Sequence, residues 1–253
     1  MKWSHWISSV LAVVVLGTVC SSELWAQAQK DQKEAPTKKK AAKQKNVHPS
    51  LVKVEETPGL PRVLLIGDSI SMGYTVPVRE LLKGKANVLR PPTNCGPTTR
   101  GVESIDAWLG DGKWDVIHFN FGLHDMVFFA ADGKSRAEPG TQGARHQVSL
   151  EDYEKNLRTL VERLKKTNAR LIWCSTTPVP EGAAGRVADE AVEFNKVAAK
   201  VMMEHGITVN DLHAFALPQL NSIQLPKNVH FTPEGSKVLA KQVASTIEAA
   251  LKL

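Results

Sequence analysis

From Arg62 onward, short apolar runs alternate with segments of helical periodicity, and this alternation limits the possible folds more than any other feature. The apolar runs, each of the length of a buried strand, cover residues 63–66, 87–89, 115–121, 171–174 and 207–209. The expected helices cover residues 76–82, 99–109, a long segment beginning at 149, 187–204 and 233–251. Parallel strands need long crossovers, which helices supply. The sequence therefore predicts an α/β fold of three α/β/α layers around a five-stranded parallel sheet.

The positive charge of the chain is concentrated in one short segment. The formal net charge is +6 and the pI is about 9.2. Residues 30–46 hold seven Lys against two acids, which leaves residues 47–253 at about +1. A nearly neutral body gives no indication of nucleic-acid binding, so we expect no nucleic-acid partner.

The N-terminal residues have the pattern of a secretory signal. Lys2 precedes an apolar run over 6–19, and Ala26-Gln27-Ala28 supplies small residues at the spacing that signal peptidase accepts. The apolar run is shorter than the roughly 20 residues of a spanning helix, so an uncleaved membrane anchor ranks second. Lipid attachment at Cys20 is a further alternative, although Val19 fits it poorly.

These patterns divide the chain into three parts. We expect a signal peptide over 1–28, a Lys-rich flexible linker over 29–60, and a single folded domain over 61–253. The mature protein would then be exported, periplasmic or extracellular, with no integral membrane span. Outside the signal only Cys95 and Cys174 remain, and either a single disulfide or two buried thiols is compatible with export.

A serine directly after the first expected strand is the strongest local indication of chemistry. Gly67-Asp68-Ser69 follows the apolar run and places the serine in a strand-to-helix turn at the carboxyl edge of the sheet. Backbone N–H groups at such a turn can stabilise an oxyanion. The spacing differs from the G-x-S-x-G elbow of α/β-hydrolases. Alone, the tripeptide is also ordinary turn chemistry.

A histidine near the other end of the chain supplies the matching base. Residues 228–235 read NVHFTPEG, with His230 just before the cap of the last expected helix. In a doubly wound sheet, the loop after the last strand returns to the edge that holds Ser69. A serine becomes a nucleophile when an adjacent base accepts its proton, and histidine is the usual base near neutral pH.

Four blocks in this order resemble the SGNH (GDSL-like) hydrolase family. They are GDSI after the first strand, a glycine after the second, G-x-x-D after the third, and the late VHFTPEG. The resemblance covers residues 62–253. It implies a flavodoxin-like sheet, no metal or cofactor, and hydrolysis of an ester, often an acetyl ester on a sugar or a lipid ester.

The resemblance also implies roles for single residues. Ser69 is the nucleophile and His230 the base, and the oxyanion hole comprises the N–H groups of Ser69 and Gly96 together with a side chain at position 124. The family usually has asparagine where this chain has His124, whose N–H can serve the same purpose. Asp68 and Asp125 are expected to support the turns in which they lie.

A second departure concerns the acid of the triad. In the family it lies three residues before the base, where this chain has Lys227. Asn228 or a backbone carbonyl could accept the imidazole proton instead, and Asp211 or Glu234 could act from elsewhere. Because the acid chiefly holds the tautomer and stabilises the imidazolium, a Ser–His pair is expected to work more slowly without it.

The sequence thus predicts an exported serine esterase acting on small-molecule, carbohydrate or lipid esters, with acetylated polysaccharide as the first expectation. One competing hypothesis is a degenerate member that binds glycan or lipid without turnover. Another is a surface protein that works through its Lys-rich tail. The substrate and the oligomeric state do not follow from the sequence.

Overall fold

The computed structural model describes residues 47–253. The predicted signal peptide and residues 29–46 of the predicted linker lie outside the described residues, so the following concerns the domain alone.

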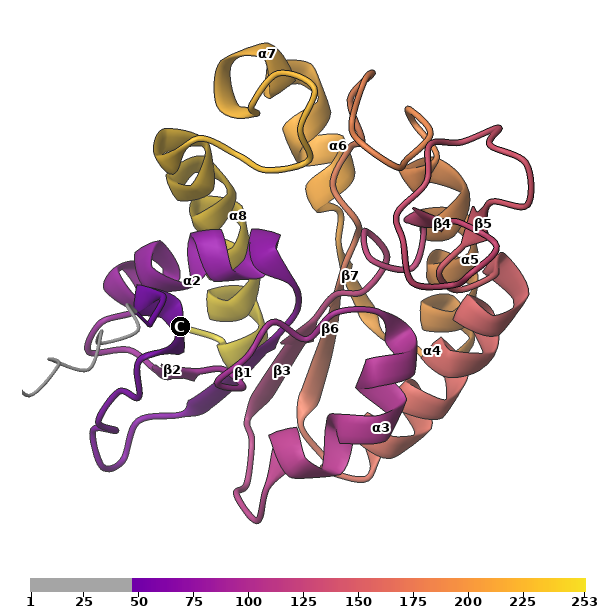
Figure 1. The fold of residues 1–253 in the computed structure, drawn as a ribbon. Helices are drawn as coiled ribbons and strands as arrows, with labels where there is room; N and C mark the ends of the chain where they lie inside the picture. The colour runs from indigo at the N-terminus through magenta and orange to yellow at the C-terminus, as the bar shows by residue number, and fades with distance from the viewer. Residues whose placement is uncertain (1–46) are drawn as a thin grey trace, which may run out of the picture. The chain divides into compact units, whose positions relative to one another are not determined.

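The centre of the domain is a single sheet of five parallel strands (Figure 1). Its strand order is β2-β1-β3-β6-β7, with every neighbouring pair parallel. The strands are β1 (Arg62–Ile66), β2 (Asn87–Leu89), β3 (Val116–Phe119), β6 (Arg170–Cys174) and β7 (Thr208–Asn210). This is the predicted architecture, and all five expected strands are present with ends within two residues of those expected.

Helices cover both faces of the sheet and form the outer two layers (Figure 1). On one face α2 (Ser69–Leu81) packs against α8 (Pro233–Leu251). On the other, α4 (Leu150–Lys165) lies between α3 (Thr98–Leu109) and α5 (Ala191–Glu204). The central strands are therefore buried on both sides, as their continuous apolar runs require.

Two helix starts follow directly from local chemistry. Ser149 Oγ accepts the backbone N–H of Asp152 at 3.0 Å and donates to its carboxylate, which stabilises the first turn of α4. Thr232 caps α8 by accepting the N–H of Gly235 at 2.9 Å, and Pro233 occupies the first helical position. Both helices begin where the sequence predicts.

The helix after the nucleophile differs from the prediction. It was expected over 76–82 but begins at Ser69, because Asp68 Oδ1 accepts the N–H of Ile70 at 2.9 Å and caps it. Gly73 lies within this helix, where a Cβ atom would come within 3.0 Å of Ser236 Oγ on α8. Close packing of α2 on α8 thus accounts for a glycine that weakens the helical pattern.

Other segments carry structure that the pattern did not indicate. The long connection over 126–148 contains a two-stranded antiparallel sheet of β4 (Phe128–Phe129) and β5 (Arg145–His146). Between β7 and α8 lie three short helical turns: α6 (Leu212–Ala216), η2 (Leu217–Gln219) and α7 (Leu220–Ile223). The predicted helix over 187–204 begins at Ala191.

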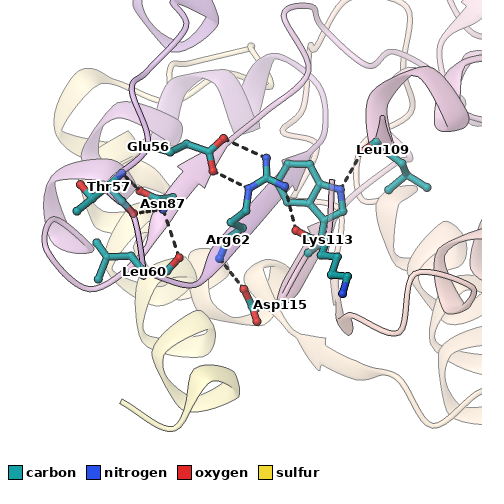
Figure 2. Close-up of polar contacts among 9 residues, drawn as sticks. Glu56, Thr57, Leu60, Arg62, Asn87, Leu109, Lys113 and Asp115 are labelled. Atoms are coloured by element: carbon teal, nitrogen blue, oxygen red, sulfur yellow. Dashed lines mark hydrogen bonds and ion pairs between the residues drawn. The ribbon is translucent and has the colours of Figure 1, made fainter. Parts of the chain in front are cut away.

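Residues 47–60, the end of the predicted linker, belong to the folded domain. The short helix η1 (Pro49–Leu51) contacts α2, and Ser50 is fully buried. Figure 2 shows how the segment is held at the amino edge of the sheet: Glu56 pairs with Arg62, and Thr57 exchanges hydrogen bonds of 2.8 and 2.9 Å with Asn87. These contacts make residues 47–60 part of the folded domain, which was expected to begin at residue 61.

Two further observations complete the fold. Cys95 and Cys174 are both buried and unbonded, so of the two alternatives for the thiols, the structure has two free cysteines. Within residues 47–253, no helix is long and apolar enough to cross a bilayer.

Candidate active site

Ser69 is the first residue of α2 and lies at the carboxyl end of β1. Asp68, just before it, is buried and directs its carboxylate to the backbone N–H of Ile70. The backbone N–H of Ser69 has no hydrogen-bond partner among residues 47–253. Asp68 thus fixes the turn and occupies the neighbouring N–H, while the N–H of Ser69 remains available to a ligand.

His230 reaches the same edge from the connection between α7 and α8. A β-bridge joins Gln224 to Phe231, and the N–H of Leu225 donates to the carbonyl of His230 at 2.9 Å. The imidazole Nε2 lies 2.8 Å from Ser69 Oγ, although 161 positions separate the residues in the chain. The structure therefore brings the two predicted reactive side chains into hydrogen-bond contact.

Asn228 contacts the other nitrogen of the imidazole. Its Oδ1 lies 2.7 Å from His230 Nδ1 and also accepts the backbone N–H of His230 at 3.0 Å. A backbone N–H can only donate, so the atom that faces it is the amide oxygen. Nδ1 must then carry the proton, which leaves Nε2 free to accept the hydroxyl proton of Ser69.

The other two candidate acids do not reach the imidazole. Asp211 caps α6 by accepting the N–H of Ala214 and also accepts the Ser175 hydroxyl at 2.9 Å. Glu234 lies 3.8 Å from Lys237 on the exposed side of α8. Within the described residues, Asn228 is the side chain in hydrogen-bond contact with His230 Nδ1.

The other two expected oxyanion donors, Gly96 and His124, differ in whether an N–H group is free to bind a ligand. Gly96 has a positive φ of 66°, and its N–H already donates to Asn94 Oδ1 at 2.9 Å. His124 lines the cavity beside Ser69, and burial lowers the pKa of its imidazole, with Asp68 opposing the shift. His124 is therefore neutral near pH 7 and has one N–H to donate.

Asn94 is a site residue that sequence reasoning did not single out. Its side chain lines the same cavity as Ser69 and His230. Because Oδ1 accepts the N–H of Gly96, the amide nitrogen is the free end of the group, with no hydrogen-bond partner among the described residues. The signal was present in the order Asn94-Cys95-Gly96, since an asparagine two residues before an N–H readily forms such a turn.

The buried guanidinium of Arg90 ties the two loops of the site together. It donates to the Gly67 carbonyl at 3.1 Å and to the Thr93 carbonyl at 3.2 Å. It also donates to the hydroxyls of Ser71 and Thr75 on α2. A single side chain, that of Arg90, thus fixes the position of the loop before Ser69 relative to the loop that contains Asn94.

Asp125 and Gly122 shape the turn that carries His124. Asp125 Oδ1 accepts both the backbone N–H and the hydroxyl of Thr98, at the start of α3. Burial raises the pKa of the Asp125 carboxyl to about 7. Gly122 has a φ of 149°, and a Cβ atom there would lie 2.2 Å from Thr176 Oγ1. Asp125 therefore contacts its own turn and α3 rather than the reactive pair.

The Ser69–His230 pair lies between two hollows of the surface. The larger has a volume of about 380 Å³. Its lining comprises Asp68, Ser69, Asn94, Leu123, His124, Arg136, Ala183, Ala184, Arg186, Lys227, Asn228, Val229 and His230. The smaller, of about 250 Å³, is lined by His48, Ser69, Ile70, Met72, Gly73, His230, Phe231 and Ser236. An ester bound across the pair would have space for one of its two parts on each side.

The described residues include no cluster of three or more His, Cys, Asp or Glu side chains arranged to hold a metal ion. His118 belongs to the core: it is fully buried in β3, and burial lowers the pKa of its imidazole to about 4.

Comparison with known proteins identifies the class. The sheet, its helices and a serine after the first strand define a three-layer α/β hydrolase of the SGNH type. The model of the GDSL-like lipase/acylhydrolase family matches residues 65–238. The chain belongs to this family and is a hydrolase acting on ester bonds. Curated protein sequences give no match to the chain.

Solved structures share the fold at low sequence identity. The acetyl xylan esterase AlAXEase is 15% identical with a TM-score of 0.59, over 74% of this chain and 99% of its own. The lipase/acylhydrolase from Enterococcus faecalis is 19% identical with a TM-score of 0.60, over 75% and 96%. A carbohydrate acetylesterase family member from Sinorhizobium meliloti is 16% identical with a TM-score of 0.59, over 77% and 100%. At these identities the likeness shows the fold alone.

Proposed function

We propose that the protein is an exported serine esterase that hydrolyses acetyl or other acyl esters of carbohydrate or lipid through an acyl-enzyme, with acetylated polysaccharide as the first candidate. The observation that carries the proposal is the 2.8 Å contact between Ser69 Oγ and His230 Nε2, with Nδ1 held by Asn228. Among the proteins of similar fold are an acetyl xylan esterase and a carbohydrate acetylesterase family member, which favours a glycan substrate.

The reaction proceeds in two steps. Ser69 Oγ attacks the ester carbonyl carbon while His230 Nε2 accepts its proton, and the tetrahedral intermediate collapses as His230 returns that proton to the leaving alcohol. Water then attacks the acyl-serine with His230 again as base, which releases the carboxylic acid and restores Ser69. The neutral amide of Asn228 holds the tautomer but does not neutralise the imidazolium, so turnover is slower than with a carboxylate at this position.

The negative oxygen of the intermediate is stabilised by the N–H of Ser69, the imidazole N–H of His124 and the amide nitrogen of Asn94. This assignment modifies the expectation for Gly96, whose N–H holds Asn94 in place instead of facing the cavity. Donors aimed at a developing oxyanion are worth about 10²- to 10³-fold in turnover each.

Labelling of the nucleophile tests the proposal. A fluorophosphonate reagent is expected to add one phosphonyl group to the wild-type protein, detected by intact mass, and none to Ser69→Ala. The exposed Ser222 offers a matched control, because Ser222→Ala removes a hydroxyl outside both hollows. Hydrolysis of 4-nitrophenyl acetate should be lost in Ser69→Ala and kept in Ser222→Ala. Labelling or hydrolysis that survives in Ser69→Ala would refute the mechanism.

The same assay distinguishes the esterase from the competing hypothesis of a fold that binds glycan or lipid without turnover. That hypothesis rests on Lys227 standing at the position of the family's acid. The contact between Asn228 and His230 weakens it, because the imidazole has an orienting partner. Absence of both labelling and hydrolysis in the wild-type protein would favour the binding protein.

Export is tested at the N-terminus. Removal of residues 1–28 by signal peptidase would give a mature chain that begins at Gln29. N-terminal sequencing of the protein secreted by a bacterial host should find this residue, and Ala28→Arg should block processing. A chain that keeps Met1 and stays in the cytoplasm contradicts the proposal.

A further inference from the structure

The larger hollow beside Ser69 is lined by three cationic side chains from three separate connections. Arg136 comes from the segment between β4 and β5, Arg186 from the segment between β6 and α5, and Lys227 from the segment between α7 and α8. These segments are far apart in the sequence. The fold therefore gathers positive charge at the reactive pair.

Arg186 is the most firmly held of the three. Its Nε and Nη2 donate to the Leu123 carbonyl at 2.9 and 2.7 Å, next to His124. Burial and the charge of Arg136 lower the pKa of the Arg186 guanidinium to about 10, against the opposing effect of Asp68. Arg186 thus remains charged at neutral pH and lies near enough to Arg136 for the two to repel.

Acidic groups do not balance this charge. Within residues 47–253, none of the three cations takes part in an ion pair. Asp68 is the one carboxylate in the lining, and it caps α2. Glu138, in the same connection as Arg136, accepts the N–H of Gly185 at 3.3 Å and lies outside the lining. Cations without a carboxylate partner beside a reactive group are suited to bind an anion from outside the chain.

The excess is local and is not a property of the whole body. Residues 47–253 carry a net charge of about +1, so positive charge in the cavity is matched by negative charge elsewhere. On the other side of the reactive pair, the lining of the smaller hollow contains no Asp, Glu, Lys or Arg side chain. The two hollows therefore differ in charge as well as in size.

We propose that the ester hydrolysed at Ser69 belongs to an acylated acidic sugar, whose carboxylate or sulfate binds to Arg136, Arg186 and Lys227. The inference rests on the proposed function and names its substrate class. The cavity volume of about 380 Å³ falls within the range of small-ligand sites. The sugar binds in this cavity, and the acyl group points to the smaller hollow.

Matched acetyl esters test the inference. The anionic probes are 4-acetoxybenzoate and 4-acetoxybenzenesulfonate, and the neutral probe is 4-acetoxybenzamide. We expect kcat/KM for an anionic probe to exceed that for the neutral one by about 10-fold, and this ratio to fall as salt is raised, because the charges are partly exposed. Preference for the carboxylate indicates a uronic acid and preference for the sulfonate a sulfated sugar. A ratio of one or less for both anions overturns the inference.

Variants identify the cause of the preference. Arg136→Gln combined with Lys227→Gln should lower the ratio several-fold, with Arg186 left to bind the anion, and the fold should tolerate both changes because both side chains are exposed. The control is Lys134→Gln, which removes a cation from the same connection but from outside the cavity lining. Equal ratios in the double variant and the control contradict the assignment of the anion site.

Binding separates this inference from the proposed function. If the neutral probe is hydrolysed in a Ser69-dependent manner without preference for anions, the esterase stands and the acidic-sugar assignment fails. If no probe is hydrolysed, the assignment still makes a prediction: Ser69→Ala protein should bind galacturonate oligosaccharides more tightly than galactose oligosaccharides in calorimetry, and Arg136→Gln should reduce the difference. Equal binding of the two sugars overturns it.

Discussion

Replacement of Asn228 by aspartate should make the enzyme faster. Asn228 Oδ1 accepts from both Nδ1 and the backbone N–H of His230, at 2.7 and 3.0 Å, and a carboxylate oxygen can accept both bonds in the same place. The amide nitrogen that is lost has no hydrogen-bond partner within the described domain. The substitution therefore adds one negative charge beside the imidazole with little change in geometry.

The size of the effect follows from the exposure of His230. Two unit charges about 4 Å apart attract by about 1 kcal/mol in water and about 4 kcal/mol at an effective dielectric constant of 20. His230 is exposed, so the lower part of this range applies. Stabilisation of the imidazolium by about 1–2 kcal/mol in the transition state corresponds to an increase in kcat of about 5- to 30-fold.

The assay is hydrolysis of 4-nitrophenyl acetate between pH 5 and 9. With Asn228→Asp, the acidic limb of the profile should also move to higher pH, since a carboxylate favours the protonated imidazole. Asn228→Ala should lower kcat/KM about 5- to 10-fold, the worth of about one hydrogen bond in an exposed site. Asn221→Asp adds the same charge on exposed α7 and should change neither quantity. An Asn228→Ala protein with unaltered rate and profile would refute the orienting role.

Three further outcomes are expected. Asn94→Asp keeps the bond from the Gly96 N–H but loses the amide donor and repels the oxyanion, so kcat for 4-nitrophenyl acetate should fall about 10²- to 10³-fold with little change in KM; full activity would remove Asn94 from the oxyanion hole. Because burial raises the pKa of the Asp125 carboxyl to about 7, the folded state favours its protonated form, and its stabilising effect is complete below pH 4 and lost as pH rises through 7. Relative to Asp125→Asn, the free energy of unfolding of the wild-type protein in urea should therefore fall by up to about 4 kcal/mol from pH 4 to pH 7, and a rise would contradict the assignment. Gly122→Ala puts a Cβ atom 2.2 Å from Thr176 Oγ1, so it should cost about 2–3 kcal/mol in thermal or urea unfolding, and a variant as stable as the wild type would show that the turn relaxes.

The sequence predicts the sheet and the meeting of Ser69 with His230 for one physical reason. Continuous apolar runs indicate buried parallel strands, and the carboxyl ends of parallel strands lie at one edge. A residue after the first strand and a residue in the connection after the last strand then share that edge, and the packing of α8 on α2 brings His230 beside Ser69. The start of α2 at Ser69 could not be predicted in this way. Gly73 weakens the helical pattern there, and it is required by packing against α8 and not by local propensity.

Features that depend on irregular segments could not be predicted in this way. Arg136 and Arg186 come from connections without periodicity, so their convergence on the cavity follows from tertiary contacts such as that of Arg186 with Leu123. The state of the Gly96 N–H depends on a side chain two residues away. Asn228 was one of several alternatives to an acid, and the choice between them required the geometry around His230.

The segment that precedes β1 has a consequence for any shortened version of the protein. The family match starts at residue 65, yet His48 lines the smaller hollow beside Ser69 and η1 packs on α2. A chain trimmed to begin at β1 would retain Ser69 and His230 but lack one wall of the hollow that we propose receives the acyl group. Acyl-chain selectivity measured on such a fragment would then be broader than that of the whole enzyme.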